Sequence, residues 1–134
     1  MELSHLDDKG QIKMVDVSDK KHTERTATAQ CKVKMKETTL KAIIENNIKK
    51  GDVLTTAKLA GIQAAKKTYE LIPLCHNIFI SNIDISIEID KQNNQVVLTS
   101  FAKTTDRTGI EMEALTSVTV AALTIYDMCK ALDK

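Results

Sequence analysis

Hydrophobic and polar residues alternate in two stretches of this chain. Apolar residues occupy every second position from 27 to 35, and isoleucine does so from 83 to 89. A further stretch, 96–103, follows the turn-rich residues 91–95. Alternation with a period of two is typical of a strand that is buried on one face. We therefore predict one early strand and, later, a β-hairpin.

Segments in which apolar residues have helical spacing lie between the first two predicted strands and after the last one. This spacing runs from Leu40 to Ile48, with Gly51 as the predicted stop, which gives a helix of about three turns. It also runs from Ile110 to Leu132, which predicts that the last helix is the longest element.

A further helix is predicted between these two. It should begin near Asp52 and end before Ile72-Pro73, because proline disfavours helical geometry in the preceding residue. Its small residues fall on one face, where another backbone could approach closely. These are Ala57, Ala60, Gly61, Ala64 and Ala65.

The order of the elements is strand, helices, strand, strand, helix. It indicates an α+β fold with a ferredoxin-like antiparallel sheet and helices packed on one face. The final strand of that fold is missing from the pattern. A three-stranded sheet has open edges that can pair with another chain, so we expect an oligomer.

The length of 134 residues suits a single domain, 1–134, in which residues 1–12 are expected to form a flexible N-terminal segment. No apolar run approaches the roughly 20 residues of a membrane span. The first thirteen residues are polar, and acidic residues come early among them. This pattern is unlike that of a secretory signal or a transit peptide, so we expect a cytoplasmic protein.

Composition excludes several classes of function. Three widely spaced cysteines give neither a disulfide framework nor a two-pair zinc site. A net charge of +1 lacks the basic excess of a general nucleic-acid binder. Any anionic ligand must therefore be held by a local cluster of basic residues.

Cys75 and His76 follow the turn at Pro73. Adjacent side chains usually diverge, so the pair is weak evidence for a nucleophile and its base. One interpretation is a buried cysteine beside a half-exposed histidine. The other is that His76 donates a hydrogen bond or carries a proton at a loop edge.

The last helix places ionisable groups near its end. At 100° per residue, Glu113, Asp127 and Lys130 fall within a sector of about 100°, whereas Glu111 points nearly the opposite way. Asp127 and Lys130 are neighbours at i, i+3. They form either a surface ion pair or a lysine and carboxylate suited to proton transfer. Spacing leaves both interpretations open.

Six long segments of this chain resemble the molybdenum-cofactor biosynthesis protein C family, the cyclic pyranopterin monophosphate synthases. The resemblance covers nearly all of the chain. The matching segments are MVDVSDK at 14–20, ERTATA at 24–29, KGDVLTTAKLAGIQAAKKT at 50–68, LIPLCH at 71–76, TGIEMEAL at 108–115 and VAALTIYDMCKALDK at 120–134.

The resemblance implies a lyase that converts 3′,8-cyclo-7,8-dihydro-GTP to cyclic pyranopterin monophosphate and releases pyrophosphate, without a cofactor or a metal. It also implies a cytoplasmic homohexamer, a trimer of dimers. The catalytic residues that it implies are Asp127, Lys130 and Lys50. The substrate-binding residues that it implies are Leu74, Cys75, His76, Glu111, Met112, Glu113 and Arg25, with Arg25 preferred to Arg107 as a phosphate contact.

The chain departs from the family pattern in two places. Family members commonly continue LCH with Pro-Leu, whereas Asn77-Ile78 stands here. The family also has a final strand and a Gly- and Lys-rich tail, whereas this sequence stops at Lys134. Either the tail is missing from the sequence as given, or this version lacks a segment that helps to hold the triphosphate.

Two other functions compete with this interpretation. A non-catalytic regulatory module of the same fold would bind a nucleotide without turnover, since fold does not fix function. An RNA-binding sheet would need aromatic residues on its central strands, and these strands offer only Phe101.

Overall fold

The computed structural model describes residues 5–19 and 21–134, in which seven helices and strands follow one another. Their bounds are β1 Arg25–Lys34, α1 Glu37–Ile44, α2 Val53–Lys66, α3 Thr68–Leu71, β2 Asn82–Asp90, β3 Gln95–Thr104 and α4 Glu111–Cys129. Each of the three predicted strands is present within two residues of its predicted bounds, and α4 is the longest element.

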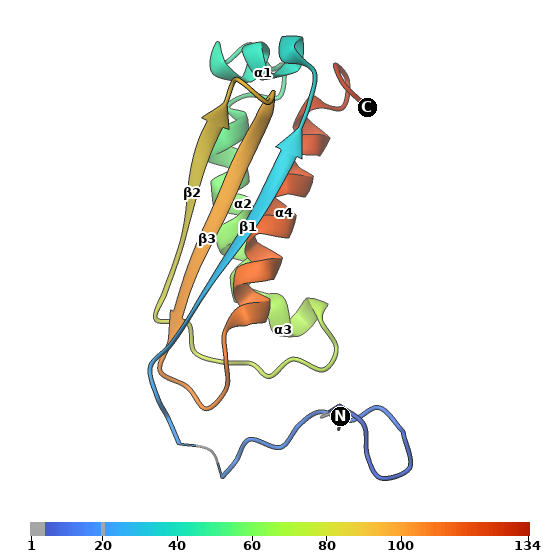
Figure 1. Ribbon diagram of the computed structural model, residues 1–134, viewed down its shortest axis with the longest axis vertical. Coiled ribbons are helices and arrows are strands. Elements are labelled where there is room, and N and C mark those ends of the chain that lie inside the picture. The colour runs from blue at the N-terminus through green and yellow to red at the C-terminus, as the bar shows by residue number, and fades with distance from the viewer. Residues whose placement is uncertain (1–4, 20) are drawn as a thin grey trace.

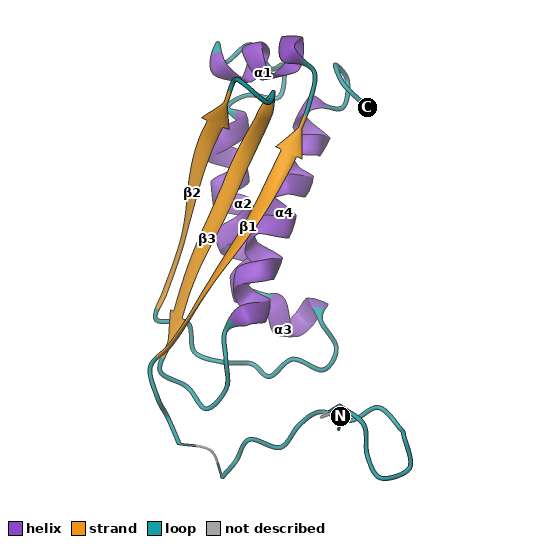
Figure 2. Ribbon diagram, viewed as in Figure 1, coloured by secondary structure: helices purple, strands orange, loops and turns teal. Residues whose placement is uncertain are grey.

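The three strands form one antiparallel sheet in the order β1-β3-β2. Helices α2 and α4 lie side by side against one face of it (Figures 1 and 2). Helix α1 lies at the end of the sheet where the C-terminus lies, and α3 lies toward the other end. The predicted α+β architecture, with helices on one face, is confirmed. Within the described residues, β1 and β2 each have one edge that pairs with no strand.

The core lies between the sheet and the two long helices. The largest fully buried side chains come from the inward face of the hairpin and from one side of α4 and the loop before it. They are Ile85, Leu98, Ile110, Ile125, Val96 and Val118. Full burial of such a side chain contributes roughly 1.5–3 kcal/mol. This packing fixes the position of α4 on the sheet.

Small residues of α2 are buried, and α4 is the helix whose backbone approaches them, which confirms the predicted close approach of another backbone. Ala57 and Gly61 are buried, and α2 and α4 pack more extensively than any other two helices. A Cβ atom added at Gly61 would lie 2.8 Å from the Ser117 backbone oxygen and 2.3 Å from the Ile85 side chain. Because Ser117 contributes backbone, which cannot rotate away, Gly61 sets the distance between the two helices.

Gly61→Ala is therefore expected to lower the free energy of unfolding by about 1–3 kcal/mol, the usual cost of overpacking a core. Chemical denaturation measures this change. Gln63→Ala, on the exposed side of the same helix, is the control, because both variants gain the helix propensity of alanine. Equal stabilities of the two variants would contradict the close approach of α2 and α4.

Helix α1 is shorter than predicted. It has eight residues, about two turns, and ends at Ile44 rather than near Gly51. Asn46 takes a left-handed conformation, φ 56°, and Asn47 donates its backbone N–H to the Ala42 carbonyl at 2.8 Å. This is the capping geometry that ends many helices, and asparagine tolerates it better than most residues. The prediction of three turns and a stop at Gly51 was wrong.

The second predicted helix is divided into α2 and α3. The Asp52 side chain caps α2 and accepts a hydrogen bond from the Thr55 backbone N–H at 3.1 Å, so the predicted start is confirmed. The break comes at Lys67, where the Thr68 hydroxyl donates to the Ala65 carbonyl at 2.9 Å. A threonine hydroxyl that bonds nearby carbonyls competes with the helix, a feature that periodicity does not show.

Residues 5–12 of the predicted N-terminal segment form a turn closed by the bridge between Leu6 and Ile12. Residues 1–4 of that segment, and Lys20 of the MVDVSDK segment, lie outside the described residues. The flexibility of residues 1–12 stays a prediction. No helix in the described part of the chain is long and apolar enough to cross a membrane.

Candidate active site

Two clefts lie at opposite ends of α4. The larger, with a volume of about 890 Å³, is bounded by loop residues 46–50 on one side and by the end of α4 on the other. The smaller, of about 280 Å³, lies where α4 begins and is bounded by the loop around Cys75. The predicted site residues divide between the two.

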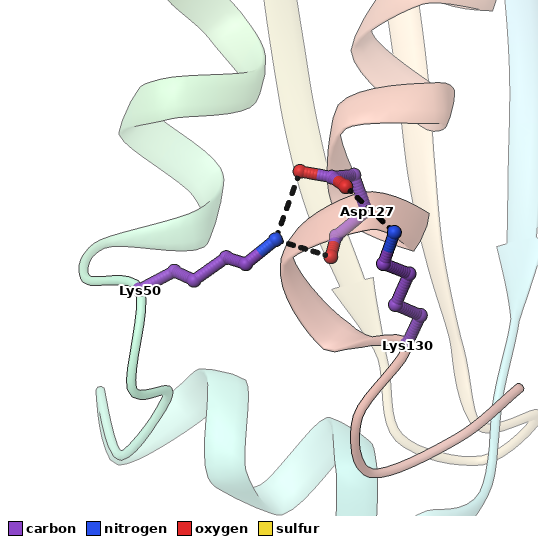
Figure 3. Close-up of polar contacts among 3 residues, drawn as sticks. All are labelled: Lys50, Asp127 and Lys130. Atoms are coloured by element: carbon purple, nitrogen blue, oxygen red, sulfur yellow. Dashed lines mark hydrogen bonds and ion pairs between the residues drawn. The ribbon is translucent and has the colours of Figure 1, made fainter.

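The larger cleft brings together all three predicted catalytic residues. Lys50 Nζ lies 3.2 Å from Asp127 Oδ2 and also donates to the Asp127 backbone oxygen at 3.1 Å. Lys130 Nζ lies 3.3 Å from Asp127 Oδ1. Figure 3 shows the two lysines approaching Asp127 from opposite sides, Lys50 from the loop before α2 and Lys130 from the end of α4. Each carboxylate oxygen thus faces one ammonium group.

The two lysines stabilise the charged form of the carboxylate. Hydrogen bonds from Lys50, the larger effect, and from Lys130 hold the pKa of Asp127 below its ordinary value. The three side chains are about half exposed, so water and ligands reach them. The cluster carries a net positive charge beside an open cleft. It can bind a phosphate group and can also exchange protons through an amine next to a carboxylate.

Lys50 reaches Asp127 because its loop has a fixed shape. Ile48 is buried and anchors the loop in the core. Gly51 has a φ of 112°, a backbone angle that residues with a side chain rarely adopt. Its N–H donates to the Ile48 carbonyl at 3.0 Å. Asp52 then begins α2. The Lys-Gly-Asp sequence therefore encodes a turn that directs Lys50 across to α4.

The smaller cleft contains all the predicted substrate-binding residues except Arg25. Those that line it are Leu74, Cys75, His76, Glu111, Met112 and Glu113. Cys75 is half-buried rather than buried, which corrects the interpretation of a buried cysteine beside a half-exposed histidine; His76 is half-buried.

Glu113 and Cys75 are both influenced by burial in this cleft. Glu113 is only 5% exposed, and burial, together with the charge of Glu111, raises the pKa of its carboxyl above the ordinary value. Burial and the charge of Glu113 raise the pKa of the Cys75 thiol. The thiol is therefore protonated at neutral pH, which disfavours nucleophilic catalysis by Cys75. Glu113 is suited to hydrogen bonding with a polar ligand edge.

Glu111 lies in the same cleft as Glu113, although helical spacing predicts nearly opposite directions. Its carboxylate folds back over Gly109, where an added Cβ atom would lie 2.0 Å from Glu111 Oε2. The absence of a side chain at residue 109 gives the carboxylate room. The helical-wheel argument failed because Glu111 begins α4 and its side chain turns toward the preceding loop.

Arg25 is not among the residues that line either cleft. It is the first residue of β1 and pairs with Thr104. Its Nε atom is buried and has no hydrogen-bond partner among the described residues. Arg107, the less favoured arginine, donates from Nε to His22 Nε2 at 2.8 Å. Arg25 therefore stays a predicted phosphate contact.

The MVDVSDK segment lies close enough to the smaller cleft to interact with it. Hydrogen bonds from Ser18 lower the pKa of Asp16, and the charge of His76 lowers it further. His5 lines the cleft directly. Sequence reasoning did not identify His5, and no spacing signal marks it, since the N-terminal segment reaches the cleft only through the fold.

Sequence reasoning also missed part of the larger cleft. Asn46 and Lys134 line it beside the predicted catalytic residues. The Asn-Asn pair before Lys49 was a usable signal, because asparagine marks positions with a left-handed backbone. Among residues 5–19 and 21–134, no group of three or more histidines, cysteines and carboxylates is placed to hold a metal ion.

Comparisons with known proteins give a consistent result. The sequence model of the MoaC family matches residues 14–134. The chain is 56% identical to the cyclic pyranopterin monophosphate synthase of Oleidesulfovibrio alaskensis, over 98% of this chain and 82% of that protein. It is 54% identical to the protein of the same name from Thermoanaerobacter sp. strain X514, over 100% of this chain and 85% of that protein. The Clostridium acetobutylicum protein of that name is 51% identical, over 98% and 81%.

Proposed function

This chain belongs to the MoaC family, and from that membership we propose that it is an enzyme with cyclic pyranopterin monophosphate synthase activity. In molybdenum cofactor biosynthesis it would convert 3′,8-cyclo-7,8-dihydro-GTP to cyclic pyranopterin monophosphate. A substrate hydroxyl attacks the phosphate nearest the sugar, and pyrophosphate leaves. This is a lyase-type rearrangement.

The observation that carries this proposal is the contact of Lys50 and Lys130 with one carboxylate at an open cleft. We assign charge neutralisation of the triphosphate to the lysines, because ammonium groups placed at developing negative charge stabilise the expulsion of pyrophosphate. Asp127 and Lys130 then move protons while the purine ring opens and the pterin ring closes.

The smaller cleft suits the other part of such a substrate. It presents the Glu113 carboxyl and the His76 ring beside the apolar side chains of Leu74 and Met112. A purine or pterin has a flat apolar face and an edge of N–H and carbonyl groups. We assign binding of the base to this cleft, with Arg25 as an additional phosphate contact.

The direct test is incubation of the protein with 3′,8-cyclo-7,8-dihydro-GTP. Release of pyrophosphate, together with a fluorescent pterin after oxidation, is the expected result. The rival is a non-catalytic nucleotide-binding module, which predicts binding without either product. A titration of substrate binding alongside the turnover assay therefore separates the two functions.

Turnover is expected to continue after metal chelation, because phosphate displacement and proton transfer can both proceed with lysines and carboxylates. Activity in excess EDTA should stay within about twofold of the untreated value, less than the 10²-fold and larger effects of essential catalytic groups. Loss of activity in EDTA that zinc or magnesium restores would show that a metal takes part.

Gly109→Ala is expected to raise KM about tenfold with little change in melting temperature. The added Cβ displaces the Glu111 carboxylate from its place over residue 109, and loss of one charged hydrogen bond to substrate has about this effect. The backbone at residue 109 suits alanine, since its φ is not positive. The result is measured by steady-state kinetics and thermal unfolding together.

The matched control is Glu111→Ala, which removes the carboxylate without altering residue 109. Both variants should raise KM to a similar extent. An unchanged KM in Gly109→Ala, together with a raised KM in Glu111→Ala, would show that the carboxylate reaches substrate without the room that Gly109 provides.

We further propose that the two clefts form one site only when two subunits meet. Glu113 and Asp127 lie on one continuous helix, and fourteen residues at 1.5 Å each separate them by ~21 Å. Antiparallel packing of two α4 helices about a two-fold axis would bring the smaller cleft of one subunit to the larger cleft of its partner.

The exposed side of α4 supports this arrangement. It carries a row of large apolar side chains that extends from one cleft to the other. They are Met112, Leu115, Leu123 and Tyr126, exposed by 38%, 47%, 63% and 49%. Apolar rows at such spacing pack helices together. We propose a cytoplasmic homohexamer, assembled from three such dimers, as the resemblance implies.

A further inference from the structure

Asp133 connects the end of α4 to the start of α1. Its Oδ2 atom accepts hydrogen bonds from the Lys36 backbone N–H at 2.8 Å and from the Thr39 hydroxyl at 3.0 Å. Its own N–H donates to the Cys129 carbonyl at 3.1 Å. The backbone of Asp133 is thus attached to the last turn of α4, while its side chain holds the first turn of α1.

Helix α1 depends on this contact because it lacks a local cap. The capping position is Lys36, whose side chain makes no capping hydrogen bond. Thr39 is 2% exposed, so its hydroxyl needs a protein partner. The hydrogen bond from the Lys36 backbone N–H and, to a smaller extent, that from the Thr39 hydroxyl lower the pKa of Asp133 below its ordinary value. A residue 97 positions along the chain thus stabilises the start of α1.

The same two helices support the larger cleft. Helix α1 leads directly into loop residues 46–50, which form one wall and carry Lys50. The end of α4 forms the other wall and carries Asp127. Asp133 does not line this cleft. It joins the end of α4, from which Asp127 projects, to the start of α1, which precedes the loop that carries Lys50.

We propose that Asp133 is a positioning residue that ties the start of α1 to the end of α4 and thereby keeps Lys50 in contact with Asp127. This inference rests on the proposed catalytic role of Lys50. Without the Asp133 carboxylate, the start of α1 loses two hydrogen bonds and the loop that carries Lys50 can move away from α4. The substitution Asp133→Asn retains an acceptor oxygen at the same place and should keep most of the contact.

The position of Lys50 can be measured without activity. In brief acylation with an N-hydroxysuccinimide ester, followed by mass spectrometry of peptides, the contacts with Asp127 should slow labelling of Lys50. Asp133→Ala should raise the labelling rate of Lys50 at least about twofold, as expected when a local segment opens more often. Lys103, which pairs with Glu24 away from α1, is the internal reference. Asp133→Asn should label like the unchanged protein.

Turnover provides the second measurement. Asp133→Ala should lower kcat about tenfold, because small displacements of catalytic groups are costly, and should leave KM within about twofold. Asp133→Asn should restore most of kcat. Asp84→Ala, which removes an exposed carboxylate paired with Lys58 outside both clefts, is the matched control and should change neither measurement.

The outcomes separate this inference from the proposed function. Unchanged labelling of Lys50 in Asp133→Ala would overturn the positioning role, whatever the turnover. Faster labelling with unchanged kcat would support positioning and refute the catalytic role of Lys50 instead. An equal loss of kcat in the Ala and Asn variants would also overturn the inference, since the asparagine oxygen preserves the acceptor.

Discussion

Lys130→Ala is expected to lower kcat by at least about 10²-fold, the usual contribution of a general acid or base. Its ammonium group lies 3.3 Å from Asp127 Oδ1 at the larger cleft, where it can both neutralise phosphate and exchange a proton. Folding should be little affected. The Lys130 side chain is 51% exposed, and an exposed ion pair contributes less than about 1 kcal/mol.

Thermal unfolding and turnover should be measured on the same preparation of Lys130→Ala. The melting temperature should fall by no more than about 3 °C, in line with the small value of an exposed pair. Lys41→Ala is the matched control, since Lys41 also makes an exposed ion pair near a helix end but lies in neither cleft. A large fall in melting temperature with activity retained would show that Lys130 serves folding rather than chemistry.

Mixing Glu113→Ala and Asp127→Ala, each of which is expected to be inactive alone, should restore activity if the site is shared between subunits. After the two proteins are unfolded and refolded together, about half of the dimers are mixed, and each mixed dimer has one intact site of two. Activity should therefore rise to about one quarter of that of the unchanged protein. The pyrophosphate assay measures this recovery.

The control mixture contains Asp127→Ala and Lys130→Ala, which alter the same cleft. Every site in a mixed dimer then has one defective residue, so no activity should return. Each variant refolded alone gives the baseline. If native mass spectrometry shows mixed dimers of Glu113→Ala with Asp127→Ala and activity stays at the baseline, the whole site lies within one chain.

Much of the fold could be predicted from local sequence. The alternation in 27–35 and 83–89 identified strands because a sheet with one buried face requires a period of two. Boundaries were less predictable where single side chains decide them. Asn46 ended α1 through its backbone conformation, and the Thr68 hydroxyl divided the second helix, neither of which changes the hydrophobic pattern.

The sequence by itself determined that Asp127 and Lys130 are neighbours, because one turn of a helix separates them. Only the tertiary structure decided that Lys50 joins them, since it lies 77 residues away along the chain and reaches Asp127 through the packing of α2 on α4. The structure likewise brought Glu111 beside Glu113 and Asp133 to the start of α1. Local spacing fixes contacts within one element, whereas contacts between elements depend on how their buried faces pack.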